Sequence, residues 1–192
     1  MSHSEYCLKY VLVGSSGSGK STMAHILEQE YGLRRCITST TRPPRAGETD
    51  GVDYHFRNHL NPEEMFEHAA FGGYEYGITR DELTRGDFII LDPQGVSYYR
   101  KHYHAPLTII QLVRDNIQVG LDRMARDRAA GFDQVHPDFI VRGETVEEMA
   151  ANLIAVIRQS SPTFSQKLDL SQPRTSSNIV DMENQKNLMH HR

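Results

Sequence analysis

Glycine and hydroxyl residues near the N-terminus form a pattern that suits phosphate binding. The segment runs Gly14-Ser15-Ser16-Gly17-Ser18-Gly19-Lys20-Ser21 and continues with Thr22. Glycines let the backbone curl so that several N–H groups point at one anion. A lysine at the end of such a loop reaches the β- and γ-phosphates of a nucleotide, and the hydroxyl after it coordinates Mg²⁺. The pattern predicts a site for a nucleoside triphosphate, with Lys20 as a catalytic cation and Ser21 as a metal ligand.

A second concentration of hydroxyl and basic residues spans Thr38–Glu48. Arg42 and Arg45 carry forked, permanently charged donors that match the oxygens of a phosphate. Because these arginines are well separated from the glycine loop, the segment predicts a second anion site. The alternative is that both arginines form surface ion pairs with Glu48 and Asp50.

The glycine loop has the flanking elements that its chemistry requires. The apolar run Tyr6–Val13 predicts a buried strand before the loop, and the pattern over Lys20–Tyr31 predicts a helix after it, with Gly32 at its end. A strand, a loop and a helix in this order are the expected setting of a phosphate-binding loop and open an α/β fold.

The alternation of strands and helices continues along the chain. Thr145 and Glu148 have the spacing of a capping box, which places the start of the last helix near Thr145. Short apolar runs are typical of the strands of a central parallel sheet. The predicted strands are Phe88–Leu91, Leu107–Val113 and Phe139–Val141, and the predicted helices between them are Val96–Tyr103 and Ile117–Arg128.

The domain organisation follows from where this alternation is interrupted. Residues 1–160 are expected to form one phosphate-loop domain. Within it, the long polar and aromatic stretch 34–85 predicts an inserted subdomain. Residues 161–192 are rich in Ser, Gln, Asn and Pro and predict a flexible polar tail.

The composition narrows the classes of partner. A formal net charge of −4 does not favour nucleic acid, and no apolar run approaches the length that spans a membrane. Cys7 and Cys36 have no metal-binding spacing, which is consistent with reduced thiols in the cytoplasm. Small-molecule nucleotides are the expected partners, and the oligomeric state is not indicated.

The motifs in combination resemble those of guanylate kinases, phosphate-loop enzymes that transfer a phosphoryl group from ATP to GMP or dGMP. After the glycine loop, the chain carries TTRPPRAGE at 40–48, EHAAFGGYEYG at 67–77 and LDPQGV at 91–96, in that family's order. The resemblance implies a three-layer α/β kinase fold with a central parallel sheet, Mg²⁺ as cofactor and GDP or dGDP as product. It also implies a set of acceptor-binding residues: Thr38, Arg42, Arg45, Glu48, Tyr54, Glu67, Tyr76, Thr79 and Asp92.

Glu67 takes the position of the family's guanine-binding carboxylate. Guanine presents two neighbouring donors, N1–H and N2–H₂, which one carboxylate can accept together. Adenine lacks such a pair and would leave a buried carboxylate unpaired. Thr79 matches a hydroxyl residue near guanine O6, and Asp92 matches an aspartate near the guanine and the metal, so Asp92 is also a candidate metal ligand.

The resemblance also implies that the inserted subdomain 34–85 binds the acceptor and that 120–137 is a short lid. This lid departs from the family pattern. Arg123, Arg126 and Arg128 are the candidate lid cations that close over the transferring group, but the family's second lid helix and its arginines are missing from 129–138. These arginines could instead form a solvated helix face with neighbouring aspartates. Two alternative functions remain: a kinase for another phosphate ester such as ribose 1,5-bisphosphate, or a catalytically weak binding module.

Overall fold

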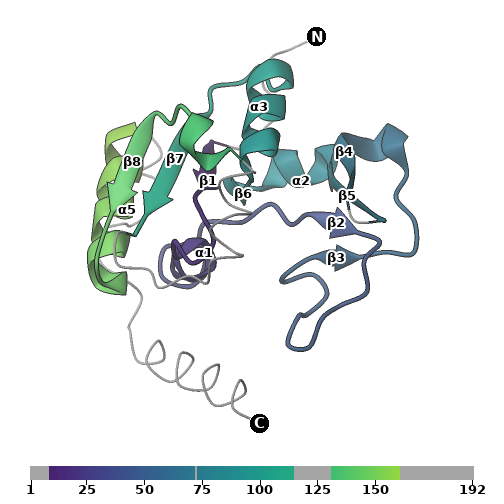
Figure 1. Ribbon diagram of the computed structural model, residues 1–192, viewed down its shortest axis with the longest axis horizontal. Helices are drawn as coiled ribbons and strands as arrows, with labels where there is room; N and C mark the ends of the chain where they lie inside the picture. Colours follow the sequence, from purple (N-terminus) through teal and green to yellow (C-terminus); the bar gives the residue numbers. More distant parts are fainter. Residues whose placement is uncertain (1–8, 72, 115–130, 161–192) are drawn as a thin grey trace.

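A parallel sheet forms the centre of the computed structural model, which describes residues 9–71, 73–114 and 131–160 (Figure 1). Its strands are β1 (Tyr10–Val13), β6 (Phe88–Ile90), β7 (Thr108–Val113) and β8 (Phe139–Arg142). They lie in the order β6-β1-β7-β8, and each neighbouring pair is parallel. Parallel strands require a long crossover, and between β6 and β7 it is made by the helix Pro93–His102.

Alternate residues of the central strands face opposite layers. Leu12 of β1 packs with Leu27 of α1 (Lys20–Gln29) and with residues of α5 (Val146–Ser160). Its neighbour Val11 belongs to the opposite cluster, with Val96 of α3 (Pro93–His102). The strand period of two therefore produces helix, sheet and helix layers, and the predicted three-layer α/β fold is confirmed.

The stretch between α1 and β6 builds a second sheet, which lies to the right in Figure 1. Its strands are β2 (Ser39–Thr40), β3 (His55–Phe56), β4 (Met65–Phe71) and β5 (Tyr74–Thr79), in the order β3-β2-β5-β4. The short helix α2 (Arg80–Arg85) leads back to β6, and 3₁₀ turns occupy Pro62–Glu64 and Phe132–Gln134.

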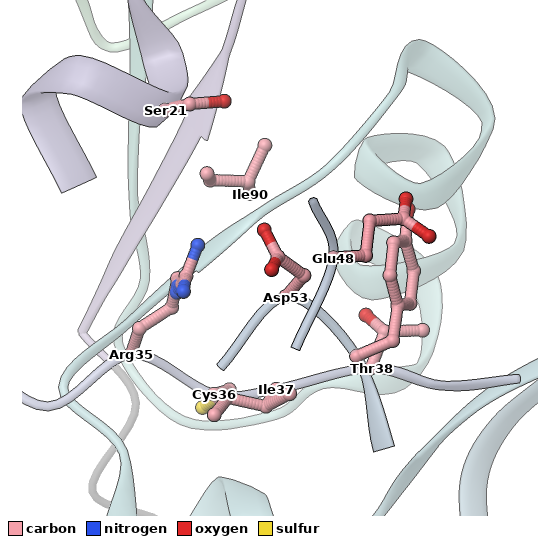
Figure 2. A pocket seen from close by; sticks show the side chains of 9 residues that line it. Ser21, Arg35, Cys36, Ile37, Thr38, Glu48, Asp53 and Ile90 are labelled. Atoms are coloured by element: carbon pink, nitrogen blue, oxygen red, sulfur yellow. The ribbon is translucent and has the colours of Figure 1, made fainter. Parts of the chain in front are cut away.

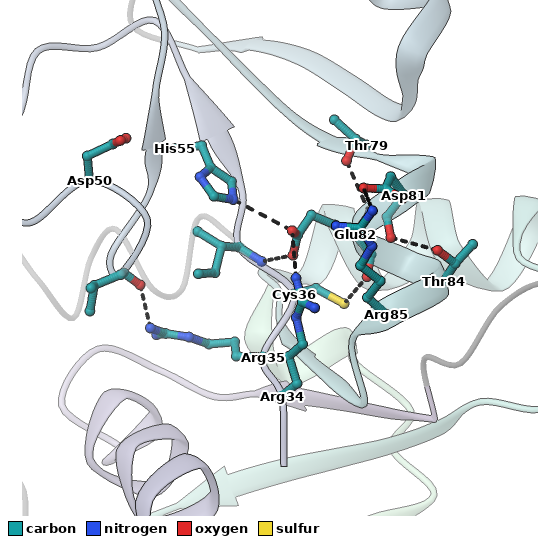
Figure 3. Close-up of polar contacts among 12 residues, drawn as sticks. Arg34, Arg35, Cys36, Asp50, His55, Thr79, Asp81, Glu82, Thr84 and Arg85 are labelled. Atoms are coloured by element: carbon teal, nitrogen blue, oxygen red, sulfur yellow. Dashed lines mark hydrogen bonds and ion pairs between the residues drawn. The ribbon is translucent and has the colours of Figure 1, made fainter. Parts of the chain in front are cut away.

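Glu82 of α2 ties the two sheets together (Figure 3). Its side chain is only 11% exposed, and its carboxylate accepts a hydrogen bond from the Ile37 backbone N–H at 3.0 Å. The same carboxylate lies 3.4 Å from Arg34 and 3.6 Å from His55. A buried carboxylate with these partners holds the chain segment that precedes β2 against α2.

Several predicted boundaries were wrong by a few residues. Helix α3 begins at Pro93, three residues before the predicted Val96, because the Asp92 side chain accepts the Gly95 N–H at 2.7 Å and caps it. At the start of α5, Thr145 accepts the Glu148 N–H as predicted, but the Glu148 carboxylate accepts from Glu144 instead of Thr145. The predicted helix over 117–128 lies outside the described residues, as do most of the predicted lid and the tail. In the described part of the chain, no helix has the length and apolar character needed to cross a membrane.

Candidate functional site

The glycine loop connects β1 to α1, and its backbone depends on glycine at specific positions. Gly17 and Gly19 have φ angles of 82° and 90°, which residues with a side chain rarely adopt. At Gly14 a Cβ atom would lie 2.5 Å from the Leu112 carbonyl oxygen, so a side chain cannot fit there. The buried Ser18 closes the turn with a backbone hydrogen bond to the Ser15 carbonyl at 3.2 Å.

Lys20 lies over this loop. Its Nζ donates to the carbonyl oxygens of Gly14 at 2.6 Å and Ser15 at 2.8 Å. The ammonium group is thereby held beside the loop at the N-terminal end of α1, where helix dipole and backbone N–H groups favour an anion. Ser21, the next residue, is exposed.

Arg42 forms a buried ion pair with Glu48. The guanidinium donates two hydrogen bonds to the Glu48 carboxylate, at 3.0 and 2.9 Å, and Arg42 is 8% exposed. Its charge also lies over the rings of Tyr54 and Phe56, at 5.3 and 5.8 Å from their centroids. Hydrogen bonding to Arg42 lowers the pKa of Glu48, and the same pairing raises the pKa of Arg42. The ion-pair alternative is thus observed for Arg42 with Glu48, whereas Asp50 pairs with Arg57 at 3.4 Å.

A pocket of about 280 Å³ lies between the glycine loop and the second sheet (Figure 2). Four of the predicted site residues line it, namely Ser21, Thr38, Glu48 and Tyr54. The fold therefore brings the hydroxyl at the end of the glycine loop and the hydroxyl of the second anion segment to the same space.

Other predicted acceptor residues do not line this pocket. Tyr76 packs edge-on against Tyr54, with ring centroids 6.3 Å apart. Arg45 is exposed, and its backbone N–H donates to Glu48 at 2.7 Å. Thr79 caps α2, because its hydroxyl oxygen accepts the Glu82 N–H at 3.2 Å.

Glu67 is directed toward the apolar layer by an irregularity in β4. The register shifts between Met65 and Glu67, so that Glu67 lies opposite Ile78, which is 1% exposed and belongs to the cluster around Tyr99. Burial raises the pKa of Glu67 to about 7, and the nearby Asp92 carboxylate adds to the rise. A carboxylate with a perturbed pKa beside a second carboxylate is a common sign of a binding or catalytic site.

The possible metal ligands are hydroxyl and carboxylate oxygens. Ser21 lines the pocket together with the carboxylates of Glu48 and Asp53, a set of hard oxygen donors that fits Mg²⁺ bound mainly by nucleotide phosphates. Asp92 does not line this pocket; it caps α3 and interacts electrostatically with Glu67. Within the described ranges, no group of three or more His, Cys, Asp or Glu side chains could hold a metal by itself.

Sequence reasoning missed five pocket residues: Arg35, Cys36, Ile37, Asp53 and Ile90. The Arg34-Arg35 pair just upstream of Thr38 was the available signal for a basic residue at the site. The lid candidates Arg123, Arg126 and Arg128 lie outside the described residues.

The fold and the site define a class: a phosphate-loop protein with an α/β core and a second polar segment facing the loop. Known proteins narrow this class. A guanylate kinase family model matches residues 7–160. A guanylate kinase from Frankia casuarinae is 31% identical over 174 residues, covering 77% of this chain and 95% of the relative. One from Thermus thermophilus is 29% identical over 192 residues, covering 84% and 87%.

The crystal structure of guanylate kinase from Anaplasma phagocytophilum superposes with a TM-score of 0.58 at 25% identity, covering 83% of this chain and 89% of that one. The chain belongs to the guanylate kinase family.

Proposed function

We propose that this protein transfers the γ-phosphoryl group of ATP to GMP or dGMP in the presence of Mg²⁺. In this reaction an oxygen of the acceptor phosphate attacks the γ-phosphorus, the bond from that phosphorus to the β–γ bridging oxygen breaks, and ADP leaves with the electron pair. The observation that carries the proposal is the single pocket shared by Ser21 of the glycine loop and Thr38 of the acceptor segment. Phosphoryl transfer needs this proximity more than it needs a strong base.

The donor side is formed by the glycine loop. Its N–H groups and the N-terminus of α1 bind the phosphates, and Lys20 moves its ammonium group from the loop carbonyls to the β- and γ-phosphates. Ser21 would hold Mg²⁺, which neutralises charge on the donor phosphates when bound. Asp92, which lies near the proposed guanine-binding residue Glu67, is a second candidate ligand for the metal.

The acceptor side has two parts. Thr38, Tyr54, Tyr76 and the arginines 42 and 45 surround the acceptor phosphate, with Glu48 orienting Arg42 through their two hydrogen bonds. Glu67 accepts N1–H and N2–H₂ of guanine, with Thr79 and Asp92 at the same end of the site.

The remaining parts of the chain act around this centre. The segment 34–85 provides the acceptor-binding residues. Arg123, Arg126 and Arg128 lie outside the described residues and are the candidate cations for neutralising charge on the transferring group. We place the protein in the cytoplasm, acting on free nucleotides; residues 161–192 lie outside the described residues.

A coupled ADP-release assay tests the function. ATP and Mg²⁺ are combined with GMP, dGMP, AMP, UMP, CMP, TMP or ribose 1,5-bisphosphate. GMP and dGMP are expected to accelerate ADP release, and the other acceptors are not. Absence of acceleration by every acceptor would overturn the enzyme assignment, and a preference for AMP would overturn the role of Glu67.

The Lys20→Ala variant tests the donor side. Removing a preorganised cation from developing charge is expected to lower kcat by about 100-fold or more. Circular dichroism and the melting temperature should stay close to those of the unmodified protein. Lys101→Ala, on the exposed last turn of α3, is the matched control and should keep full activity. Normal turnover by Lys20→Ala would contradict the assignment of the loop.

A further inference from the structure

Arg35 is held at the edge of the central sheet before the chain enters the second sheet. Its backbone forms a parallel bridge with Phe88 of β6, and the next residue, Cys36, donates its N–H to the Phe88 carbonyl at 2.7 Å. Cys36 is buried, and Ile90 of β6 lines the same pocket as Arg35. The side chain of Arg35 therefore starts from a fixed point of the fold.

The Arg35 guanidinium enters the pocket described above. Figure 2 shows it extending from the side of Cys36 and Ile37 toward Ile90 and Ser21. The side chain is 16% exposed, its Nε lies 3.4 Å from the Glu28 carboxylate, and its Nη2 donates to the Val52 carbonyl at 2.5 Å. The buried Nε makes no hydrogen bond within the described residues.

Arg35 brings a positive charge into a pocket that also contains carboxylates. Of the described residues that line the pocket, Arg35 is the only one with a cationic side chain, beside the carboxylates of Glu48 and Asp53. The predicted phosphate ligands Arg42 and Arg45 do not line it. A guanidinium has five N–H donors, and the contacts of Arg35 with Glu28 and Val52 engage only some of them, so others can bind a ligand in the pocket.

We propose that Arg35 binds phosphoryl oxygen atoms of the nucleotide in this pocket, as an additional substrate-binding residue. This inference rests on the proposed function. In the proposed function, Ser21 lies near the donor phosphates and Thr38 near the acceptor phosphate, and both residues line the pocket that Arg35 enters. The forked N–H groups of a guanidinium match two phosphate oxygens. Its fixed position on the sheet supplies a positive charge to the pocket.

The neighbouring arginine is a matched control. Arg34 differs from Arg35 by one position, is half-exposed and pairs with Glu82 on the other side of the chain (Figure 3). The experiment compares the full-length protein with Arg35→Gln, Arg34→Gln and Glu28→Gln, measuring kcat, the KM values for ATP and GMP, and the melting temperature. Arg35→Gln is expected to lower kcat/KM for GMP by about 10- to 100-fold, the effect of losing a charged hydrogen bond. Arg34→Gln should stay within about threefold of the unmodified protein.

The kinetic constants identify which phosphate Arg35 contacts. A rise confined to the KM for GMP assigns the acceptor phosphate, whereas a rise in the KM for ATP or a fall in kcat assigns the donor γ-phosphate; either supports the proposal. Equal losses in Arg35→Gln and Glu28→Gln, in both activity and melting temperature, would show that Arg35 only stabilises α1 through its ion pair with Glu28. That result would overturn the proposal. Unchanged kinetics in Arg35→Gln would overturn it as well.

A binding measurement separates this inference from the proposed function. Inorganic tripolyphosphate is titrated into the unmodified protein, Arg35→Gln and Arg34→Gln, and the shift of the melting temperature is recorded. Weaker binding by Arg35→Gln alone, by about tenfold, supports the phosphate contact even if GMP proves not to be the acceptor. Equal binding by all three proteins would overturn the contact even if GMP turnover is found.

Discussion

The proposed contact between Glu67 and guanine should make GMP binding depend on pH. Burial and Asp92 raise the pKa of its carboxyl group to about 7, so at neutral pH it is ionised in only part of the molecules. Only the ionised form accepts both N1–H and N2–H₂ of guanine. We therefore expect kcat/KM for GMP to fall as the pH drops below about 7, and GMP binding near neutral pH to release a proton. Calorimetry in buffers of different ionisation enthalpy measures this release.

The Glu67→Gln variant tests whether Glu67 is the group that links pH to GMP binding and to stability. Because the folded pKa lies above the unfolded value near 4.5, Glu67 destabilises the folded state increasingly as the pH rises from about 4.5 through 7. Glu67→Gln should bind GMP weakly at every pH, release no proton, and be at least as stable as the unmodified protein at pH 8. Proton release that persists in Glu67→Gln would assign the titration to another group.

The pair formed by Arg42 and Glu48 is predicted to be a major polar contribution to the second sheet. Glu48→Gln removes the charge that faces a buried guanidinium, and we expect a loss of about 2–4 kcal/mol in the free energy of unfolding. Arg85→Gln, which breaks the exposed pair with Asp81, is the control and should cost less than about 1 kcal/mol. Urea denaturation of both variants measures the difference, and similar small losses would contradict a buried, strong pair.

At the scale of elements, α3 and β4 meet through aromatic rings. Tyr99 is fully buried, and its ring centroid lies 5.0 Å from that of Phe66 in the irregular part of β4. Its hydroxyl has no hydrogen-bond partner among the described residues, while burial and the charge of Glu67 raise its pKa. The ring therefore stabilises the contact between the elements, and the hydroxyl does not.

Two substitutions separate these contributions. Tyr99→Phe keeps the ring and removes an unpaired polar group, so the free energy of unfolding should be unchanged or higher by about 1 kcal/mol. Tyr99→Ala should lower it by about 3–5 kcal/mol through loss of packing. Thermal and urea unfolding measure both, and a clear destabilisation by Tyr99→Phe would mean that the hydroxyl has a bound partner in solution.

The elements also show which features a sequence can predict. The loop at 14–21 and the helix after it were predictable because their signals are local: glycine positions, an apolar run and helical periodicity. The cap at Asp92 was equally local, since Asp followed by Pro is a common helix start, but it was overlooked. The only local signal for Arg35 was the Arg34-Arg35 pair, which does not show which arginine enters the pocket, because that depends on a backbone bridge to Phe88, far along the chain. The raised pKa of Glu67 likewise depends on packing between α3 and β4.

At the scale of the molecule, the two sheets position different parts of the candidate site. The parallel sheet presents the glycine loop, and the second sheet presents Thr38 and the residues around Arg42. Glu82 and the backbone bridge of Arg35 hold the chain between the two sheets in place. The pocket lies where the sheets face each other, so substrates that bind both sides should also stabilise the whole fold through mass action.

A ligand that spans the pocket tests this arrangement directly. Adenosine and guanosine joined by five phosphates would fill the donor and acceptor sides at once, and the second contact would form within a complex that already exists. Such linkage is expected to give binding at least about 100-fold tighter than that of ATP or GMP alone. The analogue with adenosine at both ends has the same charge and length but leaves Glu67 without its two donors, so it should bind more weakly. Isothermal titration calorimetry compares the four ligands. Equal affinity for the linked ligand and for GMP would mean that the two sides do not lie in one continuous site, because a shared pocket cannot hold both phosphates without coupling their binding.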